Sequence, residues 1–143
     1  MERGQLAADF FLIAHDEFSG KLKISRDLLG CGLVAAQFGA LIIAGRLGMS
    51  DGRVIVRNER GSGQDEIGAF VVKSVQSQHT RHTVRTWTRN LADVLYELVG
   101  RRLVDSGLVR REPVRSVLRR RPDRFPAVDL LRAARPRLRL EHM

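Results

Sequence analysis

Hydrophobic and polar positions along the chain follow two different periods. Apolar side chains three and four residues apart predict amphipathic helices, and short alternating runs predict strands or extended connectors. The ends are marked by Ser25, a favourable N-cap, and by Gly20 and Gly107, which act as stop signals. The longest predicted helices span residues 5–19, 26–47, 65–78 and 83–106.

The spacing of apolar residues also predicts which face of each helix is buried. On the first helix this face consists of Leu6, Phe10, Ile13 and Ala14. On the third helix it consists of Ile67, Phe70, Val71 and Val75. Trp87 falls on the apolar stripe of the fourth helix, so we expect it to pack in the core.

The second helix contains the most apolar stretch of the chain, residues 28–45, in which Gln37 is the only polar side chain. Its length is at the lower limit for crossing a bilayer, and each internal glycine weakens a helix by roughly 1 kcal/mol relative to alanine. These glycines, which allow neighbouring helices to approach closely, are Gly30, Gly32 and Gly39. Cys31 lies in the same stretch, and we expect it to be a small buried hydrophobe rather than a reactive thiol.

The residues after this stretch favour a core helix over a membrane span. Arg46 leads directly into an Asp51-Gly52 turn and the strand-like run of residues 53–56. This pattern is typical of a helix that docks against a small hairpin. We therefore expect the apolar helix to be wrapped by other parts of the protein.

The C-terminal third of the chain predicts smaller elements. Two short runs on either side of Pro113 predict a second hairpin, and residues 128–135 predict a last short helix that ends before Pro136. The predicted fold class is mainly α. It is a helical bundle around a buried, glycine-rich central helix, with one or two small β-hairpins.

Basic side chains are distributed unevenly along the chain, whose formal net charge is +9. Residues 1–99 contain 12 Lys and Arg against 11 Asp and Glu, whereas residues 100–143 contain 13 against 5. A neutral body with a basic C-terminal segment, residues 113–143, suits phosphate-bearing partners such as nucleic acid or an anionic membrane surface. The alternative is compositional, because the chain uses 22 Arg and only 3 Lys and so prefers Arg throughout.

The composition and motifs do not support an enzyme. A single cysteine excludes an intramolecular disulfide and fits a reducing cytoplasmic setting, and the N-terminus lacks the features of a secretory signal. His79 and His82 have no third ligand nearby in the sequence, and no nucleotide-binding or nucleophile motif is present. His15, beside Asp16 and Glu17, fits a solvated helix end. We therefore expect no catalytic residues, no metal and no cofactor.

The order of several short motifs resembles the Golgi phosphoprotein 3 family, especially its bacterial members. The motifs are LAADFFLIAHDEFSGK, the apolar helix ending in AGRL, GRVIV, TVRTW, ELVGRRLVDSGLV and FPAVD, in that order over residues 6–130. The resemblance implies a mainly helical fold with small hairpins, no catalysis, and binding of phosphatidylinositol 4-phosphate at the cytoplasmic face of a membrane. It also implies an adaptor role, because eukaryotic members retain glycosyltransferases.

The residues that bind lipid in that family are not matched in this chain. The family's binding tryptophan falls near Ser25, and its pocket arginines fall near Val34, Asp93 and Tyr96. A carboxylate at Asp93 would repel a phosphate by roughly 4 kcal/mol at 4 Å in a surface-like dielectric. The nearby cations that are candidate replacements for headgroup binding are Arg26, Arg85 and Arg89.

The sequence therefore predicts one domain over residues 1–143 that attaches peripherally to an anionic membrane. The candidate membrane-facing cations of its C-terminal segment are Arg115, Arg119, Arg120, Arg121 and Arg124. The resemblance implies several more helices after this chain ends. If those helices normally cover the glycine-rich helix, either a partner chain, such as a second copy, covers it here or the chain is a fragment of a larger protein. Two alternatives stay open: a winged-helix-like nucleic-acid-binding protein, and a scaffold or adaptor dimer that binds only proteins.

Overall fold

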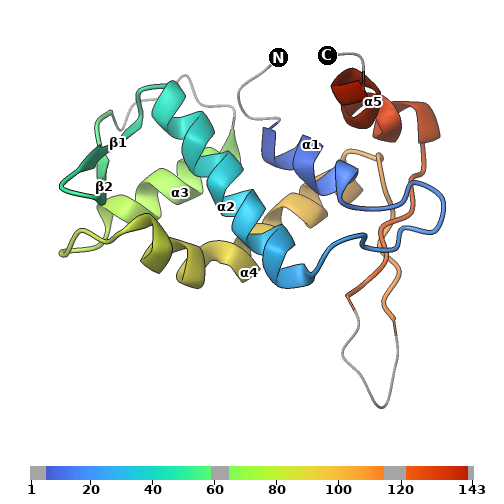
Figure 1. The fold of residues 1–143 in the computed structure, drawn as a ribbon, viewed down its shortest axis with the longest axis horizontal. Helices are drawn as coiled ribbons and strands as arrows, with labels where there is room; N and C mark the ends of the chain where they lie inside the picture. The colour runs from blue at the N-terminus through green and yellow to red at the C-terminus, as the bar shows by residue number, and fades with distance from the viewer. Residues whose placement is uncertain (1–5, 59–64, 115–121, 142–143) are drawn as a thin grey trace.

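The computed structural model describes residues 6–58, 65–114 and 122–141, which form helices and one small hairpin (Figure 1). The helices are α1 (Leu6–Ile13), α2 (Arg26–Ile43), α3 (Glu66–Gln76), α4 (Val84–Asp105) and α5 (Leu130–Glu141). The antiparallel strands are β1 (Leu47–Ser50) and β2 (Arg53–Val56). The prediction of a mainly α fold with a small hairpin is confirmed.

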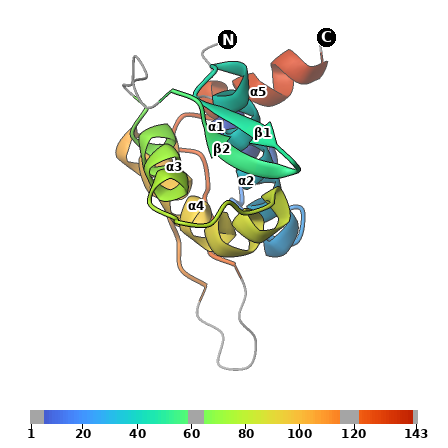
Figure 2. The ribbon, with the colours of Figure 1, turned by 90° about the vertical axis from the view of Figure 1, so that its left-hand side faces the viewer.

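Helix α2 packs most extensively against α4 and α1. Figure 1 shows α2 crossing in front of α4, with the β-hairpin and α3 toward one end of the molecule and α1 and α5 toward the other. Figure 2 views the molecule from the hairpin end, where α3 lies beside α4. The core fills the space between these helices, and Leu33, Val71 and Leu95 are completely buried there.

The start of α2 and the end of α4 have the chemistry that the sequence predicts, and Thr83 caps α4 in the same way as Ser25 caps α2. The Ser25 hydroxyl accepts a hydrogen bond from the Leu28 amide at 3.1 Å, and the Thr83 hydroxyl accepts one from the Thr86 amide at 3.2 Å. Each bond satisfies an amide that has no partner within its helix. Gly107 follows α4 with a positive φ of 78°, as a helix-terminating glycine does.

Helix α2 ends earlier than predicted. Gly45 has a positive φ of 75°, and the Arg46 amide donates to the Leu41 carbonyl at 2.9 Å. This glycine-dependent cap closes the helix at Ile43. The prediction that the helix extends to Leu47 is therefore wrong, because Leu47 begins β1.

The β-hairpin turns at Asp51 and Gly52, as predicted. Both residues have positive φ, 52° and 74°, which matches the twist of the two strands. The strand that follows places Arg53 opposite Thr83 in an isolated antiparallel bridge. The hairpin is thereby attached to the start of α4.

Two of the three glycines inside α2 allow close packing. A Cβ at Gly30 would lie 2.9 Å from the Cβ of Ala92 on α4, and a Cβ at Gly32 would overlap the Phe10 ring on α1. The prediction that glycines let neighbouring helices approach is therefore confirmed at these two positions. Gly39 differs, because a Cβ there would meet nothing within 4 Å.

The described residues cover only one side of α2. Leu33 and Val34 are fully buried on the inner side, whereas Leu28 and Ile43 are 56% and 70% exposed. Cys31 is exposed, so the prediction that it is buried is wrong. A helix that is apolar all round offers no period that separates its inner from its outer positions.

Helix α2 is also long and apolar enough to cross a membrane. However, 44% of it is buried inside the protein, and the core helix of a globular domain can be equally long and apolar.

The buried face of the first helical segment is not the predicted one. Its most buried side chains are Ala7, Phe11, Leu12, Ala14 and His15. Leu6 is 38% exposed, and Phe10 and Ile13 are only partly buried. Almost every position from 6 to 14 is apolar, so packing against α2 and α4 selects the face. Phe70 on α3 was also predicted to point inward and is 39% exposed.

After α4 the chain forms two antiparallel arms, residues 108–112 and 124–128. The Glu112 amide donates to the Arg124 carbonyl and the Arg124 amide to the Glu112 carbonyl, each at 2.8 Å. The first of the two runs flanking Pro113 was predicted to pair with the second and instead pairs with residues 124–128, so the prediction is wrong for the first run. Residues 115–121 of the second run lie outside the described residues. Pro113 has no amide hydrogen and cannot extend this ladder.

Helix α5 continues through Pro136, so its predicted end before this residue is wrong. A proline inside an isolated helix costs about 3 kcal/mol. Here Pro136 is buried, and α5 packs along α1. Arg137 adds an ion pair, with its Nε 2.8 Å from Oε1 of Glu17. Tertiary packing therefore overrides the local preference.

Candidate functional site

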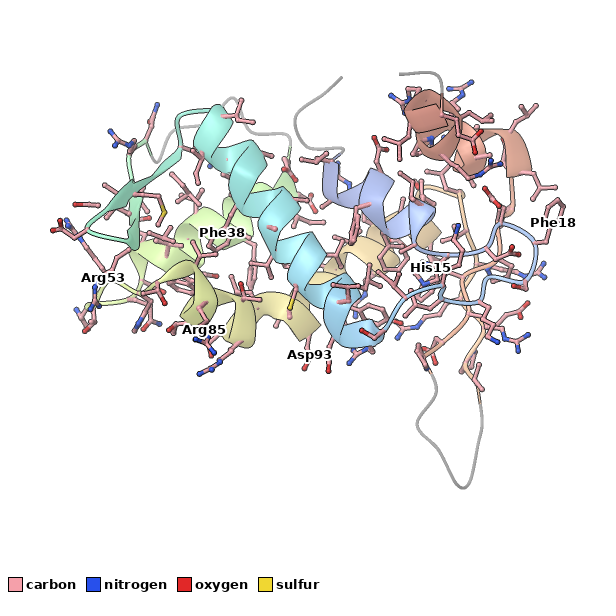
Figure 3. The ribbon with its side chains drawn as sticks, in the orientation of Figure 1. His15, Phe18, Phe38, Arg53, Arg85 and Asp93 are labelled. Carbon is pink, nitrogen blue, oxygen red and sulfur yellow. The ribbon has the colours of Figure 1, made fainter. Side chains whose placement is uncertain are left out.

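Two of the candidate headgroup residues, Arg85 and Arg89, lie on the exposed side of α4. They are one helical turn apart, and Asp93 follows one turn later. Figure 3 places Arg85 and Asp93 along the same edge of the molecule, with both side chains pointing away from the core. Within the described residues, neither arginine forms an ion pair. Both guanidinium groups therefore face solvent and have no carboxylate partner among the described residues.

The third candidate, Arg26, is held against the same edge. Its Nη1 lies 3.1 Å from Oδ1 of Asp93, and its guanidinium carbon lies 4.3 Å from the centroid of the Tyr96 ring. The Asp93 side chain is 87% exposed, so the ion pair itself contributes at most about 1 kcal/mol. Its main consequence is electrostatic, because Arg26 offsets the negative charge of Asp93.

The positions at which the resemblance would place the family's lipid pocket have other roles in this structure. Ser25 caps α2, and Val34 is fully buried in the core. Tyr96 is 3% exposed, and burial raises the pKa of its hydroxyl. Of these positions, Ser25, Asp93 and Tyr96 cluster around Arg26, whereas Val34 is out of reach of any ligand.

A second arginine, Arg111, holds the acidic residues next to this cluster. Its Nη1 and Nη2 lie 2.8 and 2.9 Å from the two carboxylate oxygens of Glu97, and its Nε lies 2.7 Å from Oδ2 of Asp123. The hydrogen bonds from Arg111 lower the pKa of the Glu97 carboxyl, and those to Glu97 and Asp123 raise the pKa of Arg111. Sequence reasoning did not single out Arg111, because its partners lie 14 and 12 residues away.

The fold brings two further arginines to the start of α4. Nη1 of Arg53 donates to the Arg81 carbonyl at 2.7 Å, and the Val54 amide donates to the His82 carbonyl at 2.8 Å. Figure 3 shows Arg53 and Arg85 at the same end of the molecule. Arg53 lies on the hairpin, 28 residues before Arg81, so no local sequence signal could have grouped them.

The arginines of the basic C-terminal segment differ in their positions and partners. Arg137 and Arg139 face Glu17 and Asp9 across α1, at 2.8 and 3.9 Å, so they help to dock α5. Arg124 is exposed on the second arm. The remaining candidates, Arg115, Arg119, Arg120 and Arg121, lie outside the described residues.

Trp87 on α4 packs in the core, and the ring of His82 contacts it. Trp87 is 4% exposed, which confirms the prediction of core packing. The His82 ring meets Trp87 edge-on, with 5.6 Å between ring centroids. In the parts of the chain that the structure describes, no three His, Cys, Asp or Glu side chains gather as metal ligands.

A comparison with known protein families identifies the family of this chain. The family model of Golgi phosphoprotein 3 (GPP34) matches residues 6–143. The chain belongs to the Golgi phosphoprotein 3 family. The match runs from α1 through α5 and therefore includes both the arginine-bearing edge of α4 and the two arms. No curated protein matches the chain.

One titratable group in this family member is buried against expectation. His15 is 3% exposed, and its ring stacks on Phe11 at 4.5 Å between centroids. Its Nδ1 lies 2.7 Å from the Phe11 carbonyl, which can only accept, so Nδ1 carries the proton. Nε2 is buried without a partner among the described residues. The prediction that His15 sits at a solvated helix end is therefore wrong, because the segment turns back under Phe125.

Replacing His15 with Leu is expected to flatten the dependence of stability on pH. Burial lowers the pKa of His15 below its usual 6.5, so the unfolded chain takes up the proton first. The wild-type free energy of unfolding should therefore fall as the pH drops below about 6.5. Urea denaturation of both proteins between about pH 7.5 and 5 measures the difference. Parallel pH profiles would show that the histidine is solvated in the folded protein.

Proposed function

We propose that this protein is a peripheral membrane protein that binds anionic lipid headgroups and performs no catalysis. The headgroup is that of phosphatidylinositol 4-phosphate or of a simpler anionic lipid, at the cytoplasmic face of a membrane. Membership of the Golgi phosphoprotein 3 family carries the proposal. The solvent-facing guanidinium groups of Arg85 and Arg89, which have no carboxylate partner among the described residues, supply the matching chemistry.

The charges along the α4 edge support attraction of a phosphate. Arginine binds phosphate oxygens through several N–H donors and stays charged at every physiological pH. Arg53 and Arg81 add positive charge at the start of α4, and Arg26 offsets the charge of Asp93, the carboxylate one turn after Arg89. Each basic side chain near an anionic surface contributes on the order of 1 kcal/mol. Several together suffice for reversible, salt-sensitive binding.

The residues at the positions of the family's lipid pocket favour recognition of a headgroup by its charge over recognition by a closely fitting cavity. Ser25 stands where the family has its binding tryptophan, and Val34 and Tyr96 are buried where the family has arginines. A headgroup would therefore meet separate exposed guanidinium groups, chiefly Arg85 and Arg89. We expect selectivity among anionic lipids to follow their charge.

Vesicle sedimentation tests this proposal. The wild-type protein should sediment with vesicles containing phosphatidylserine or phosphatidylinositol 4-phosphate and not with phosphatidylcholine alone, and binding should weaken as salt is raised. R85E/R89E should bind anionic vesicles about tenfold more weakly or worse. The matched control is K73E/R132E, which makes the same change in net charge at exposed positions on α3 and α5 and should bind like the wild type.

The nucleic-acid alternative is tested in the same experiment. Titration of duplex DNA at two salt concentrations runs beside the vesicles, because a basic surface attracts any polyanion. Binding to DNA without binding to any vesicle would overturn the membrane proposal. Equal loss of vesicle binding in R85E/R89E and in K73E/R132E would overturn the role of the α4 edge.

A further inference from the structure

A cleft of about 250 Å³ lies between the connector that follows α1, residues 14–25, and the ends of the two arms. It is lined by Lys21, Leu22, Val114, Pro122 and Arg124. Two of these residues are cations, three are apolar, and none is acidic. The cleft is separate from Arg85 and Arg89, which lie on α4.

Backbone hydrogen bonds place the two cations opposite each other on neighbouring segments that line this cleft. The Phe125 amide donates to the Gly20 carbonyl at 2.9 Å, and the Ala127 amide donates to the Glu17 carbonyl at 2.8 Å. The connector and the second arm therefore run antiparallel, which sets Lys21, after Gly20, opposite Arg124, before Phe125. Two like charges held across such a pair are unfavourable unless an anion joins them.

Two acidic residues of the arms and their ends, Glu112 and Asp123, already have cationic partners. Oε1 of Glu112 lies 2.9 Å from Nε of Arg110, and Oδ2 of Asp123 lies 2.7 Å from Nε of Arg111. Lys21 and Arg124 form no ion pair with any described residue. The positive charge of the cleft is therefore not cancelled from within the described chain.

We infer that this cleft binds a phosphate ester of a membrane lipid, with Lys21 and Arg124 as the phosphate contacts. The apolar wall of Leu22, Val114 and Pro122 packs against the carbon atoms next to the phosphate. A cleft of this size holds a phosphate with its ester carbons and not a whole lipid. The inference rests on the proposed function and adds a second contact to it.

The position of the cleft fits simultaneous contact with one membrane. In Figure 1 the arms lie toward the lower edge of the view, the side on which Figure 3, in the same orientation, places Arg85 and Asp93. A bilayer that approaches this side meets the α4 edge and the arms together. The two contacts then reinforce each other, because the second forms without a further loss of translational freedom.

The test compares K21E/R124E with the wild type and with the control K73E/R132E. Sedimentation with vesicles of phosphatidylserine and phosphatidylcholine should show at least about a tenfold loss for K21E/R124E and none for the control. K21R/R124K keeps both charges and should bind like the wild type. Circular dichroism and thermal unfolding of K21E/R124E should match the wild type, because both side chains are exposed.

A second arm of the experiment identifies the source of the phosphate. Amide chemical shifts of Leu22 and Arg124 are followed during titration with inorganic phosphate and with glycerol 3-phosphate. Small shifts that saturate only at millimolar ligand, together with the loss of vesicle binding in K21E/R124E, support the lipid. Tight binding of glycerol 3-phosphate with unchanged vesicle binding of K21E/R124E would overturn the lipid assignment in favour of a free phosphate ester.

The remaining outcomes separate this inference from the proposed function. Wild-type binding to anionic vesicles with equal binding by K21E/R124E, and no amide shifts at the cleft, would overturn the cleft and leave the proposed function standing. Failure of the wild type to bind any anionic vesicle would overturn the proposed function, and the lipid ligand of the cleft with it.

Discussion

Replacing Phe11 with Ala is expected to lower the free energy of unfolding by about 3–5 kcal/mol. The Phe11 ring is fully buried, stacks on His15 at 4.5 Å between centroids, and meets Phe125 edge-on at 5.0 Å. His15 follows α1 and is paired with Leu22, and Phe125 lies on the second arm, whose backbone is hydrogen-bonded to Gly20, so neither neighbour can move in to close the cavity. Domains of this kind have a total stability of about 5–15 kcal/mol. Urea denaturation should therefore show a much lower midpoint.

The matched control for this prediction is Phe18→Ala. Phe18 is 77% exposed, so its removal should change the free energy of unfolding by no more than about 0.5 kcal/mol. Similar losses in the two variants would contradict the assignment of Phe11 to the core. An unchanged slope of stability against urea would show that the two variants unfold from the same compact state.

Replacing Gly20 with Ala is expected to cost about 2–5 kcal/mol, from two sources. Gly20 has a φ of 71°, a conformation that costs an L residue about 1–2 kcal/mol. A Cβ there would also overlap the backbone of Phe125 and Pro126, which adds about 1–3 kcal/mol. The arm cannot move away without breaking the 2.9 Å hydrogen bond from the Phe125 amide to the Gly20 carbonyl. Thermal and urea denaturation measure the loss.

Gly107→Ala separates the backbone cost from the cost of steric overlap. Gly107 also has a positive φ, 78°, but a Cβ there would meet nothing within 4 Å. Only the backbone cost of about 1–2 kcal/mol should appear. If both variants lost the same stability, the connector would not pack against the second arm as described, and the cleft beside Lys21 would lose its basis.

The sequence predicted the starts of α2 and α4 and the end of α4 better than it predicted helix faces. Three other ends were wrong, because α1 ends at Ile13 and not at residue 19, α2 ends at Ile43, and α5 continues past Pro136. Ser25, Thr83 and Gly107 act locally, through their own hydroxyls or backbone angles, so their effect can be read from neighbouring residues. The faces depend on what packs against each helix. Because α1 and α2 are apolar nearly all round, periodicity could not tell that His15 is buried or that Cys31 is exposed.

The C-terminal elements failed for a related reason. Pro136 is normally a helix breaker, and only the packing of α5 on α1 shows why the helix continues. The pairing partner of the first arm was predicted wrongly, because Pro113 suggested a local turn, whereas this arm pairs with residues 124–128. Long-range pairing of this kind has no local signature.

The candidate site was predictable in part. The exposed row of Arg85 and Arg89 follows from helical spacing alone, and the structure places both on the exposed side of α4. The contacts of Arg26 with Asp93 and Tyr96 form only because α2 packs on α4. Arg26 and Asp93 are 67 residues apart in the sequence, so no local pattern predicts their ion pair. The opposition of Lys21 and Arg124 likewise needs the arms to fold against the connector.

The most direct test of the account asks how the protein is held on a membrane. Purified protein is bound to phosphatidylserine vesicles at low salt and then washed with about 1 M NaCl, where the Debye length is about 3 Å. If exposed arginines hold the protein while α2 stays packed against α1 and α4, the wash should release nearly all of it. Protein that stays on the vesicles through the wash, and leaves only with detergent, would mean that α2 is inserted in the bilayer and would contradict the account.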